Sequence, residues 1–402
     1  MTLKVIRVGD LGRIVTGDTP LKSRSEFYGS AYPFIKPTDM KVGQRFTFAY
    51  DECYSEEAFE KYRKKLIPAG STAVVTIGSI GQKLTLTHTP CFVNQAVNAV
   101  IPDPLRFDSV YVYYLLRHNL QLVKSADTGA SSGRENVSKS NFSGIELSAC
   151  LDLDEQKRIA KVLNSYDSLI EINQKRISLL EESARLLYRE WFVNFRFPGH
   201  AAAKAEAGLP AGWEMGAIGD LALFLNRGMT PTYDDAASGL VINQKCIRGG
   251  RLNLKPARKQ SKVVKPERQI QIGDVLINST GAGTLGRVAQ VRTPIPDCTV
   301  DTHVTIVRPS DGKSAAYLGV ALLELEPVLS TMGIGSTNQL ELGRADIAGL
   351  SIFMPPLAMR EEFHELVWPL FMQAETLAKT NEHLTEARDA LLPKLMSGEI
   401  QV

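Results

Sequence analysis

The chain has 402 residues, enough for two or three domains that each bury a core. Apolar residues make up 44% and charged residues 22%, and the formal net charge is only +2, so overall charge does not indicate a nucleic-acid binder. The chain contains no long apolar run, no signal peptide and no C-x-x-C pair among its five cysteines, so we expect no membrane span and a cytoplasmic location.

The first 150 residues are predicted to form a mixed α+β globule that is rich in strands. Runs of β-branched residues at 72–78, 82–88 and 96–102 predict strands, and the segment 108–123 predicts a helix.

A long helix is predicted from Asp154 to about Phe192, because no Pro or Gly interrupts this segment. Its apolar positions alternate in steps of four and three, which is a heptad seam. Pro198-Gly199 is predicted to stop the helix, and an Ala/Lys/Glu-rich linker lies within 195–214. The seam consists of Ile159, Leu163, Tyr166, Ile170, Asn173, Ile177, Leu180, Ala184 and Leu187.

The second half of the chain repeats the first. Six segments recur in the same order at an offset of roughly 204 to 211 residues. For example, VGDLGRIVTGDTP at 8–20 matches IGDLALFLNRGMTP at 218–231, and the predicted helix at 108–123 has its counterpart at 314–329. We interpret this pattern as a duplicated unit of about 200 residues.

A second heptad seam ends the second copy. Asn381 and Arg388 occupy seam positions there, and a lone polar residue in a seam commonly fixes the register of a helix pair. We therefore predict that the two long helices pack on each other rather than on their own globules. This seam consists of Phe363, Val367, Leu370, Ala374, Leu377, Asn381, Leu384, Arg388, Leu391 and Leu395.

Together these elements predict an α+β fold. Two strand-rich domains related by pseudo-two-fold symmetry are joined by two long helices that pack as an antiparallel coiled coil. The predicted ranges are 1–150 for the first globule, 151–197 for the central helix, 198–352 for the linker and second globule, and 353–402 for the C-terminal helix.

The stretch STGAGTLGR at 279–287 contains Gly281-x-Gly283-x-x-Gly286, the spelling of a dinucleotide-binding loop. Such a loop needs a helix directly after it, but here a β-branched run broken by prolines follows. The equivalent first-half segment is Gly78-Ser79-Ile80-Gly81. We therefore predict a tight strand-to-strand turn in which glycine permits close approach of the backbone to a partner.

Catalytic chemistry is sparse in this sequence. Walker A, H-E-x-x-H and G-x-S-x-G motifs are absent, and neither half repeats an acid, base or metal set. Asp297, Asp311 and Lys313 resemble the acidic-lysine pattern of metal-dependent nucleases, which leaves a nuclease as a weak alternative. The pattern favours a binding protein with no catalytic residue and no metal, and a scaffold that binds two proteins but no DNA is the other alternative.

Local charge favours DNA binding. The segment 245–268 contains nine Lys/Arg and one Glu, and it is either a solvated loop or a surface that neutralises phosphates. Arg, Asn and Gln, the residues that pair with base edges, cluster in repeat-equivalent loops. The candidate DNA-binding residues are Lys36, Ser79, Gln82, Asn94, Gln95, Ser131, Arg134 and Asn136 in the first half, and Arg227, Lys245, Arg248, Arg251, Asn278, Arg287, Thr302, His303, Ser336, Asn338 and Gln339 in the second.

The whole chain resembles the specificity subunit of type I restriction–modification systems. The resemblance rests on the duplication, on LDEQKRI at 153–159, REWFVNFRFPGH at 189–200 and LPAGWE at 209–214, and on LLPKLMSGEI at 391–400.

The resemblance implies that each globule is a target recognition domain that reads one half of a split site in double-stranded DNA. It also implies two modification subunits that use S-adenosylmethionine to methylate adenine, and restriction subunits that use ATP and Mg²⁺, with none of these cofactors held by this chain. A helix of about 38 residues is roughly 57 Å long. Because one turn of DNA is about 34–36 Å, the helices predict half-sites separated by about one to one and a half turns.

Overall fold

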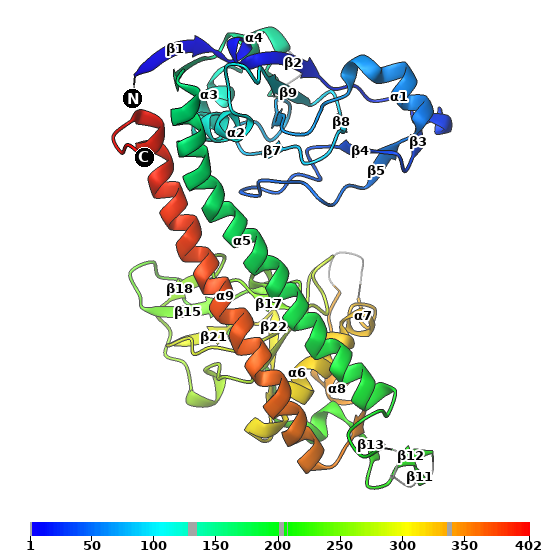
Figure 1. The fold of residues 1–402 in the computed structure, drawn as a ribbon. Helices are drawn as coiled ribbons and strands as arrows, with labels where there is room; N and C mark the ends of the chain where they lie inside the picture. The colour runs from blue at the N-terminus through cyan, green and yellow to red at the C-terminus, as the bar shows by residue number, and fades with distance from the viewer. Residues whose placement is uncertain (1, 128–134, 201–204, 207, 336–339) are drawn as a thin grey trace. The chain divides into compact units, whose positions relative to one another are not determined.

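The computed structural model describes residues 2–127, 135–200, 205–206, 208–335 and 340–402 (Figure 1). The chain forms two compact units: the first contains Met1–Ile172 and Asn381–Val402, and the second contains Asn173–Thr380. Each unit therefore combines one strand-rich globule with a segment of each long helix. The predicted domain ranges, which separate the globules from the helices, stay a prediction.

The first unit contains two four-stranded sheets. Its central sheet has the order β2-β9-β6-β7, and its distal sheet, with the order β3-β5-β4-β8, includes a parallel pair, β4 and β8. Its strands are β1 (Leu3–Arg7), β2 (Gly12–Thr16), β3 (Tyr28–Gly29), β4 (Tyr32–Ile35), β5 (Glu52–Tyr54), β6 (Thr72–Val75), β7 (Leu84–Leu86), β8 (Phe92–Val93), β9 (Val97–Pro102) and β10 (Glu146–Cys150). Its short helices are α1 (Glu56–Tyr62), α2 (Ser109–His118), α3 (Leu120–Ser125) and α4 (Lys139–Gly144).

The second unit repeats this topology. Its central sheet has the order β14-β22-β19-β20, and its distal sheet β18-β15-β21 again includes a parallel pair, β15 and β21. Its strands are β11 (Ala205–Glu206), β12 (Leu209–Pro210), β13 (Glu214–Ala217), β14 (Ala222–Arg227), β15 (Gly239–Ile242), β16 (Ile247–Arg248), β17 (Arg251–Leu252), β18 (Arg258–Gln260), β19 (Val275–Asn278), β20 (Val288–Gln290), β21 (Cys298–Val300), β22 (Val304–Pro309) and β23 (Ser351–Met354). Its short helices are α6 (Ala315–Glu324), α7 (Glu326–Leu329) and α8 (Arg344–Ala348).

The matching strand orders confirm the duplication that the sequence predicts. The antiparallel pair β1–β10 of the first unit has its counterpart in β13–β23 of the second. The two distal regions differ, however. Helix α1 follows β5 in the first unit, whereas the second unit has the small β16–β17 hairpin before β18 and a 3₁₀ turn, Pro266–Arg268, after it.

The two predicted short helices are each interrupted. The segment 108–123 forms α2 and α3 with a break at Asn119, and the segment 314–329 forms α6 and α7 with a break at Leu325. Asp108 caps α2 by accepting hydrogen bonds from the backbone N–H groups of Val110 and Tyr111. These helices carry the apolar side chains that join each central sheet to the long helices.

The long helices are α5 (Leu153–Tyr188), which continues as a π-helical turn at Arg189–Val193, and α9 (Leu357–Ser397). The predicted end of the first helix at about Phe192 is confirmed to within a residue, but Pro198-Gly199 is not what stops it. The helix ends at Val193, and Phe195 turns the chain with φ 55° before the proline is reached. Among the described residues, no helix combines the length and apolar character needed to cross a membrane.

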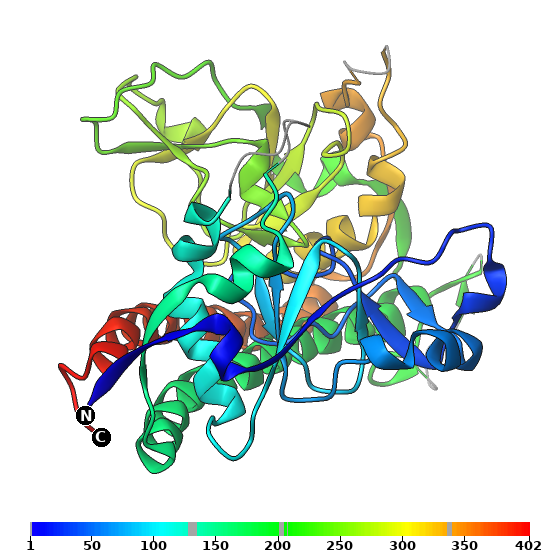
Figure 2. The same ribbon diagram turned by 90° about the horizontal axis from the view of Figure 1, so that it is seen from above.

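In each unit the segments of α5 and α9 lie antiparallel. In the first unit, Ile159 and Leu163 near the start of α5 share a core with Leu392 and Leu395 near the end of α9. Arg158 Nε donates to the Val402 carbonyl at 2.8 Å, and both chain ends lie beside the start of α5 (Figures 1 and 2). In the second unit, Ala184 shares a core with Phe363, Val367 and Phe371.

The predicted seam residues all lie on the buried or half-buried face of their helices. Arg388 is 2% exposed and forms an ion pair with Asp167, which is 3% exposed and also accepts a hydrogen bond from the Tyr114 hydroxyl at 2.6 Å. Burial and the Asp167 carboxylate raise the pKa of Tyr114, so its hydroxyl stays a donor. Arg388 therefore belongs to a buried charged contact that joins α5 and α9 within the first unit.

Candidate nucleic-acid interface

Loops at one edge of the first unit converge around the ends of β4, β6 and β8. Asn94 N donates to the Ile35 carbonyl at 3.2 Å, which places the loop after β8 beside the end of β4. Thr76 N donates to the Ala96 carbonyl, and Val137 N donates to the Thr76 carbonyl, each at 2.9 Å. Because parallel strands end at the same edge, this arrangement gathers Lys36, Ser79, Asn94, Gln95 and Asn136 in one loop cluster. We call it the first loop edge.

The second unit forms an equivalent cluster, the second loop edge, from the loops that follow β15, β19 and β21. Gln244 Nε2 donates to the Thr280 carbonyl at 2.8 Å, and the Thr280 hydroxyl lies 2.8 Å from His303 Nδ1. Asp301 N donates to the Ile242 carbonyl, and Leu342 N donates to the Ser279 carbonyl. Burial raises the pKa of Asp301, whose carboxylate accepts a hydrogen bond from His303 N.

Several predicted DNA-binding residues already have partners within the chain. Asn278 is fully buried and donates to the Gln244 carbonyl at 3.1 Å, and Arg227 pairs with Glu341. The Lys36 Nζ atom lies 3.7 Å from a carboxylate oxygen of Asp51 and 3.5 Å from one of Glu52. Arg251 lies away from the loop edge, because its guanidinium pairs with Glu181 of α5 and Glu375 of α9.

Other candidates present polar groups at the surface. Gln82, Gln95, Asn136, Lys245, Arg248 and His303 are exposed, and Ser79, Asn94, Arg287 and Thr302 are half-buried. Ser131, Arg134, Ser336, Asn338 and Gln339 lie outside the described residues. The assignment of all these residues to DNA contact stays a prediction.

The basic run 245–268 divides into structural and free cations. Arg251 contacts the long helices, Arg268 donates to the carbonyls of Arg227 and Gly228, and Arg258 stacks 3.4 Å over the Tyr233 ring. Lys262 Nζ donates to the Thr230 carbonyl at 3.0 Å. Five other exposed side chains have neither an ion pair nor a side-chain hydrogen bond or ring contact among the described residues, and they are available to phosphates. These are Lys245, Arg248, Lys255, Lys259 and Lys265.

Two pairs of residues near the proposed interface could not be identified as such from the sequence. Gln244 and Thr280 complete the polar chain to His303, and their role follows only from the parallel pairing of β15 and β21. In the first unit, Lys61 and Arg63 near the end of α1 lie over the rings of Phe27 and Phe59. The sequence offers the KYRKK run as the only indication of those cation–π contacts.

The glycine-rich stretch is a strand-to-strand turn between the antiparallel strands β19 and β20, as predicted. Gly281, Gly283 and Gly286 all have positive φ, and so do the equivalent Gly78 and Gly81. A Cβ on Gly286 would collide with the backbone nitrogen of Ser330, so the partner that the turn approaches is the chain's own segment after α7.

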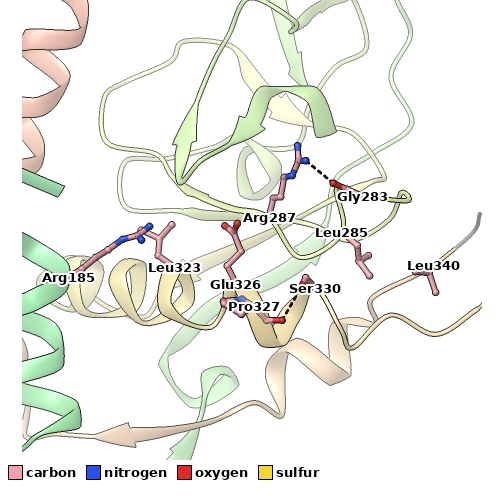
Figure 3. A pocket seen from close by; sticks show the side chains of 9 residues that line it. All are labelled: Arg185, Gly283, Leu285, Arg287, Leu323, Glu326, Pro327, Ser330 and Leu340. Atoms are coloured by element: carbon pink, nitrogen blue, oxygen red, sulfur yellow. Dashed lines mark hydrogen bonds between the residues drawn. The ribbon is translucent and has the colours of Figure 1, made fainter. Parts of the chain in front are cut away.

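A pocket of about 410 Å³ lies beside this turn (Figure 3). Arg287 donates to the Gly283 carbonyl at 2.7 Å, and Glu326 accepts a hydrogen bond from Val288 N at 3.0 Å. These contacts hold the turn against α7 and give the pocket a mixed lining of Arg185, Gly283, Leu285, Arg287, Leu323, Glu326, Pro327, Ser330 and Leu340. The helix N-terminus in this lining is that of the four-residue α7, where Glu326 brings a carboxylate and Pro327 lacks an N–H. A dinucleotide site requires instead a helix that directly follows the glycine turn and offers its N–H groups to a phosphate.

The residues of the nuclease alternative have other roles. Asp311 caps a 3₁₀ turn by accepting a hydrogen bond from Ser314 N at 2.7 Å, and Lys313 pairs with Glu361 at 2.9 Å. Asp297 occupies a turn with φ 48°. Within the described ranges, no group of three or more His, Cys, Asp or Glu side chains is placed to hold a metal ion.

Comparison with known proteins identifies the class. The model of the family described as "Type I restriction modification DNA specificity domain" matches residues 2–182. Over 99% of its length the chain is 25% identical to the type I restriction enzyme MjaIX specificity subunit of Methanocaldococcus jannaschii, and the match covers 93% of that protein. Residues 2–182 belong to this DNA specificity domain family, and over its whole length the chain is similar to type I restriction–modification specificity subunits.

Two further similarities agree with this assignment. The type I restriction enzyme HindI specificity subunit of Haemophilus influenzae is 33% identical over 181 residues, which is 44% of this chain and 37% of that protein. The crystal structure of a type I restriction-modification S subunit from M. genitalium superimposes with a TM-score of 0.63 at 16% identity, covering 98% of this chain and 96% of that one. This last similarity supports the fold.

Proposed function

We propose that this chain binds double-stranded DNA at a split target site, with each loop edge reading one half-site. The observation that carries the proposal is the duplication of the loop edge with different side chains. The loop after β8 presents Gln95 in the first edge, whereas the equivalent loop after β21 presents His303 in the second. Equivalent scaffolds with different polar side chains would read different base sequences.

The distal regions support an unequal division of phosphate contacts. The second unit offers five exposed cations from 245–268 without a side-chain partner among the described residues. The distal region of the first unit offers Lys41 and Lys64, while its Lys36, Lys61 and Arg63 engage acids or rings. The expected target is therefore asymmetric, and the second unit contributes most of the salt-dependent affinity.

The long helices are proposed to dock two modification subunits and to set the gap between half-sites. On α5 and the π-helical turn that follows it, Leu179, Leu186 and Val193 are 57%, 50% and 52% exposed at seven-residue intervals. A stripe with this period fits a helix of a partner protein, and we assign it to a modification subunit. Methylation, ATP-driven restriction and the S-adenosylmethionine, ATP and Mg²⁺ that they need would belong to the partner subunits.

The first experiment is selection from a randomised DNA pool by the chain, alone and with its modification subunits, at several salt concentrations. Enrichment of a split motif with a fixed gap is the expected result. Binding without enrichment would reduce the chain to a non-specific basic surface, and no binding in either state would favour a protein scaffold.

The role of the helices has its own test. Lengthening α5 by four residues adds about 6 Å of helix and should change the preferred gap. The matched control is a four-residue insertion after Gly199, an exposed position with φ 82° and open space around it. An unchanged gap in the α5 variant would contradict the proposed role of the helices.

A further inference from the structure

The apolar clusters of the distal sheets include no side chain of the long helices among the described residues. In the first unit, the distal core is built around Phe34, Tyr54 and Phe92, and no residue of α5 or α9 belongs to it among the described residues. The adjoining cluster around Ile35 and Val93 also lacks them. In the second unit, the cluster that contains Ile242, Ile247 and Val300 likewise includes no described residue of either helix. The clusters around Ile35 and Ile242 pack each distal sheet on its central sheet. Direct contact between the distal regions and the long helices comes mainly from polar groups.

Arginine supplies that contact in the first unit. Arg45 lies in the connection from β4 to β5 and is only 5% exposed. Its guanidinium donates to Glu171 through Nε at 3.1 Å and through a terminal nitrogen at 2.6 Å, and it also contacts Asn164 and Ser168. These three partners lie on one face of α5, and the guanidinium stacks 4.4 Å from the centre of the Phe46 ring. The bidentate geometry fixes direction as well as distance.

The second unit has a larger version of the same contact. Arg251, in the connection from β15 to β18, lies 3.0 Å from both Glu181 of α5 and Glu375 of α9. Arg292, two residues after β20, lies 2.9 Å from Glu181 and 3.5 Å from Glu375. Its guanidinium stacks 3.8 Å from the centre of the Phe371 ring on α9. The β16–β17 hairpin and the connection from β20 to β21, which both lead into the distal sheet, are thus joined to both helices by two arginines and two carboxylates with no net charge.

The two contacts are repeat equivalents. Positions 251 and 45 differ by 206, and positions 375 and 171 differ by 204, which are offsets within the range that relates the two halves of the chain. The distal sequences otherwise differ, since one contains α1 and the other the β16–β17 hairpin. Both halves have an arginine–glutamate contact at equivalent positions, although their distal regions are otherwise dissimilar. This indicates that the contact has the same role in both halves, which is to hold the distal region on a long helix.

We propose that Arg45 in the first unit, and Arg251 with Arg292 in the second, are positioning residues that fix each distal sheet on its long helices and thereby sharpen the gap length that the protein accepts. This inference rests on the proposed reading of a split site. Each arginine acts through the helix carboxylates and touches neither loop edge. Its loss therefore frees the distal sheet to shift while leaving the polar groups that read bases unchanged.

The test uses the full chain with its modification subunits and a DNA library in which both half-sites are constant and the gap varies by single base pairs. In Arg45→Gln and in the double variant Glu181→Gln, Glu375→Gln, the preference for the native gap over its neighbours should fall by about tenfold, the middle of the range for coupled contacts. The half-site sequences selected from a random pool should not change. Glu182→Gln, an exposed acid on the same helix without an ion pair among the described residues, is the matched control.

Two further variants separate positioning from simple stability. Arg45→Lys keeps the charge but loses the bidentate geometry, so it should broaden the gap preference with little loss of melting temperature. The exchange Arg45→Glu with Glu171→Arg should restore part of the preference that either change alone removes. A lower melting temperature with an unchanged gap preference would overturn the inference. If the unmodified chain selects no split motif at all, the proposed function itself fails, and this inference fails with it.

Discussion

Removing one partner of the Asp167–Arg388 ion pair should destabilise the first unit strongly. Both side chains are almost completely buried, and each is held by further groups. Asp167 accepts from the Tyr114 hydroxyl at 2.6 Å and lies 3.8 Å from Arg117, while Arg388 also pairs with Asp389 at 2.8 Å. Neither charge would be left in water if its partner were deleted.

The structure sets the size of the expected loss in unfolding free energy. Breaking a buried ion pair by removing one partner costs about 3–5 kcal/mol, because the remaining charge stays buried without compensation. The half-exposed Asp389 still pairs with Arg388 in Asp167→Ala. The loss of unfolding free energy in this variant should therefore lie at the lower end of that range, about 3 kcal/mol. For a folding unit of about 200 residues, this loss lowers the melting temperature by roughly 6–12 °C.

The second unit suggests how the pair can be replaced. The repeat equivalents of Asp167 and Arg388 are Phe371 and Ala184, which are buried in one apolar cluster. The triple variant Asp167→Phe, Arg388→Ala, Tyr114→Phe removes both charges and the hydroxyl that would lose its acceptor. It should unfold within about 1 kcal/mol of the unmodified chain.

The assay is chemical and thermal unfolding of the single, double and triple variants, with size in solution measured in parallel. Coupling in the Asp167–Arg388 double-mutant cycle should be large and favourable. A single substitution that costs less than about 1 kcal/mol, or a triple variant less stable than Asp167→Ala, would refute the reasoning.

Three further predictions follow from the described geometry. Replacing Lys245, Arg248, Lys255, Lys259 and Lys265 by Gln should reduce the slope of log affinity against log salt by up to about 4–5, measured by titration with non-specific DNA, and an unchanged slope would remove them from the phosphate contacts. Gly286→Ala should lower the melting temperature well beyond Gly283→Ala, because both residues have positive φ but only Gly286 is pressed against Ser330; equal shifts would contradict that difference. Burial lowers the pKa of His364 in the folded chain. Its contribution to stability is therefore present above the pKa of the unfolded chain, near 6.5, and is lost as pH falls through the lower folded pKa. His364→Gln should reduce the fall in melting temperature between about pH 7 and pH 5.

Much of the fold follows from the sequence, because duplication and helix periodicity are local patterns that need no knowledge of partners. The seam at Ile159 or Val367 is visible as spacing, and the turn at Gly283 is visible from the strand that follows it. The end of the long helix is predicted at about Phe192, but the sequence does not show what stops the helix there. The long helix stops at Val193 through a π-helical turn and the left-handed Phe195, which carry no breaker residue.

The candidate site is harder to predict, because long-range contacts determine which polar side chains remain free. Arg251 and Lys245 belong to the same basic run, yet one pairs with Glu181 and Glu375 and the other is exposed. Asn278 fits the rule for pairing with adenine, but the strand places it inside the unit. Composition identifies the region, and only the three-dimensional arrangement separates structural cations from available ones.

The difference between the two ends of the seam gives a nearly symmetric chain a defined pairing. If two copies of α5 paired antiparallel, the repeat would set Asp167 opposite Ala184, and Arg117 would be the cation left beside the buried carboxylate. If two copies of α9 paired, Arg388 would lie opposite Phe371 and keep only Asp389 as a partner. Each alternative would lose the buried ion pair at a cost of about 3 kcal/mol at each such site. Pairing of α5 with α9 therefore satisfies both residues at once, and the apolar triple variant, which removes this discrimination, should gain a tendency to self-associate that the size measurement would detect.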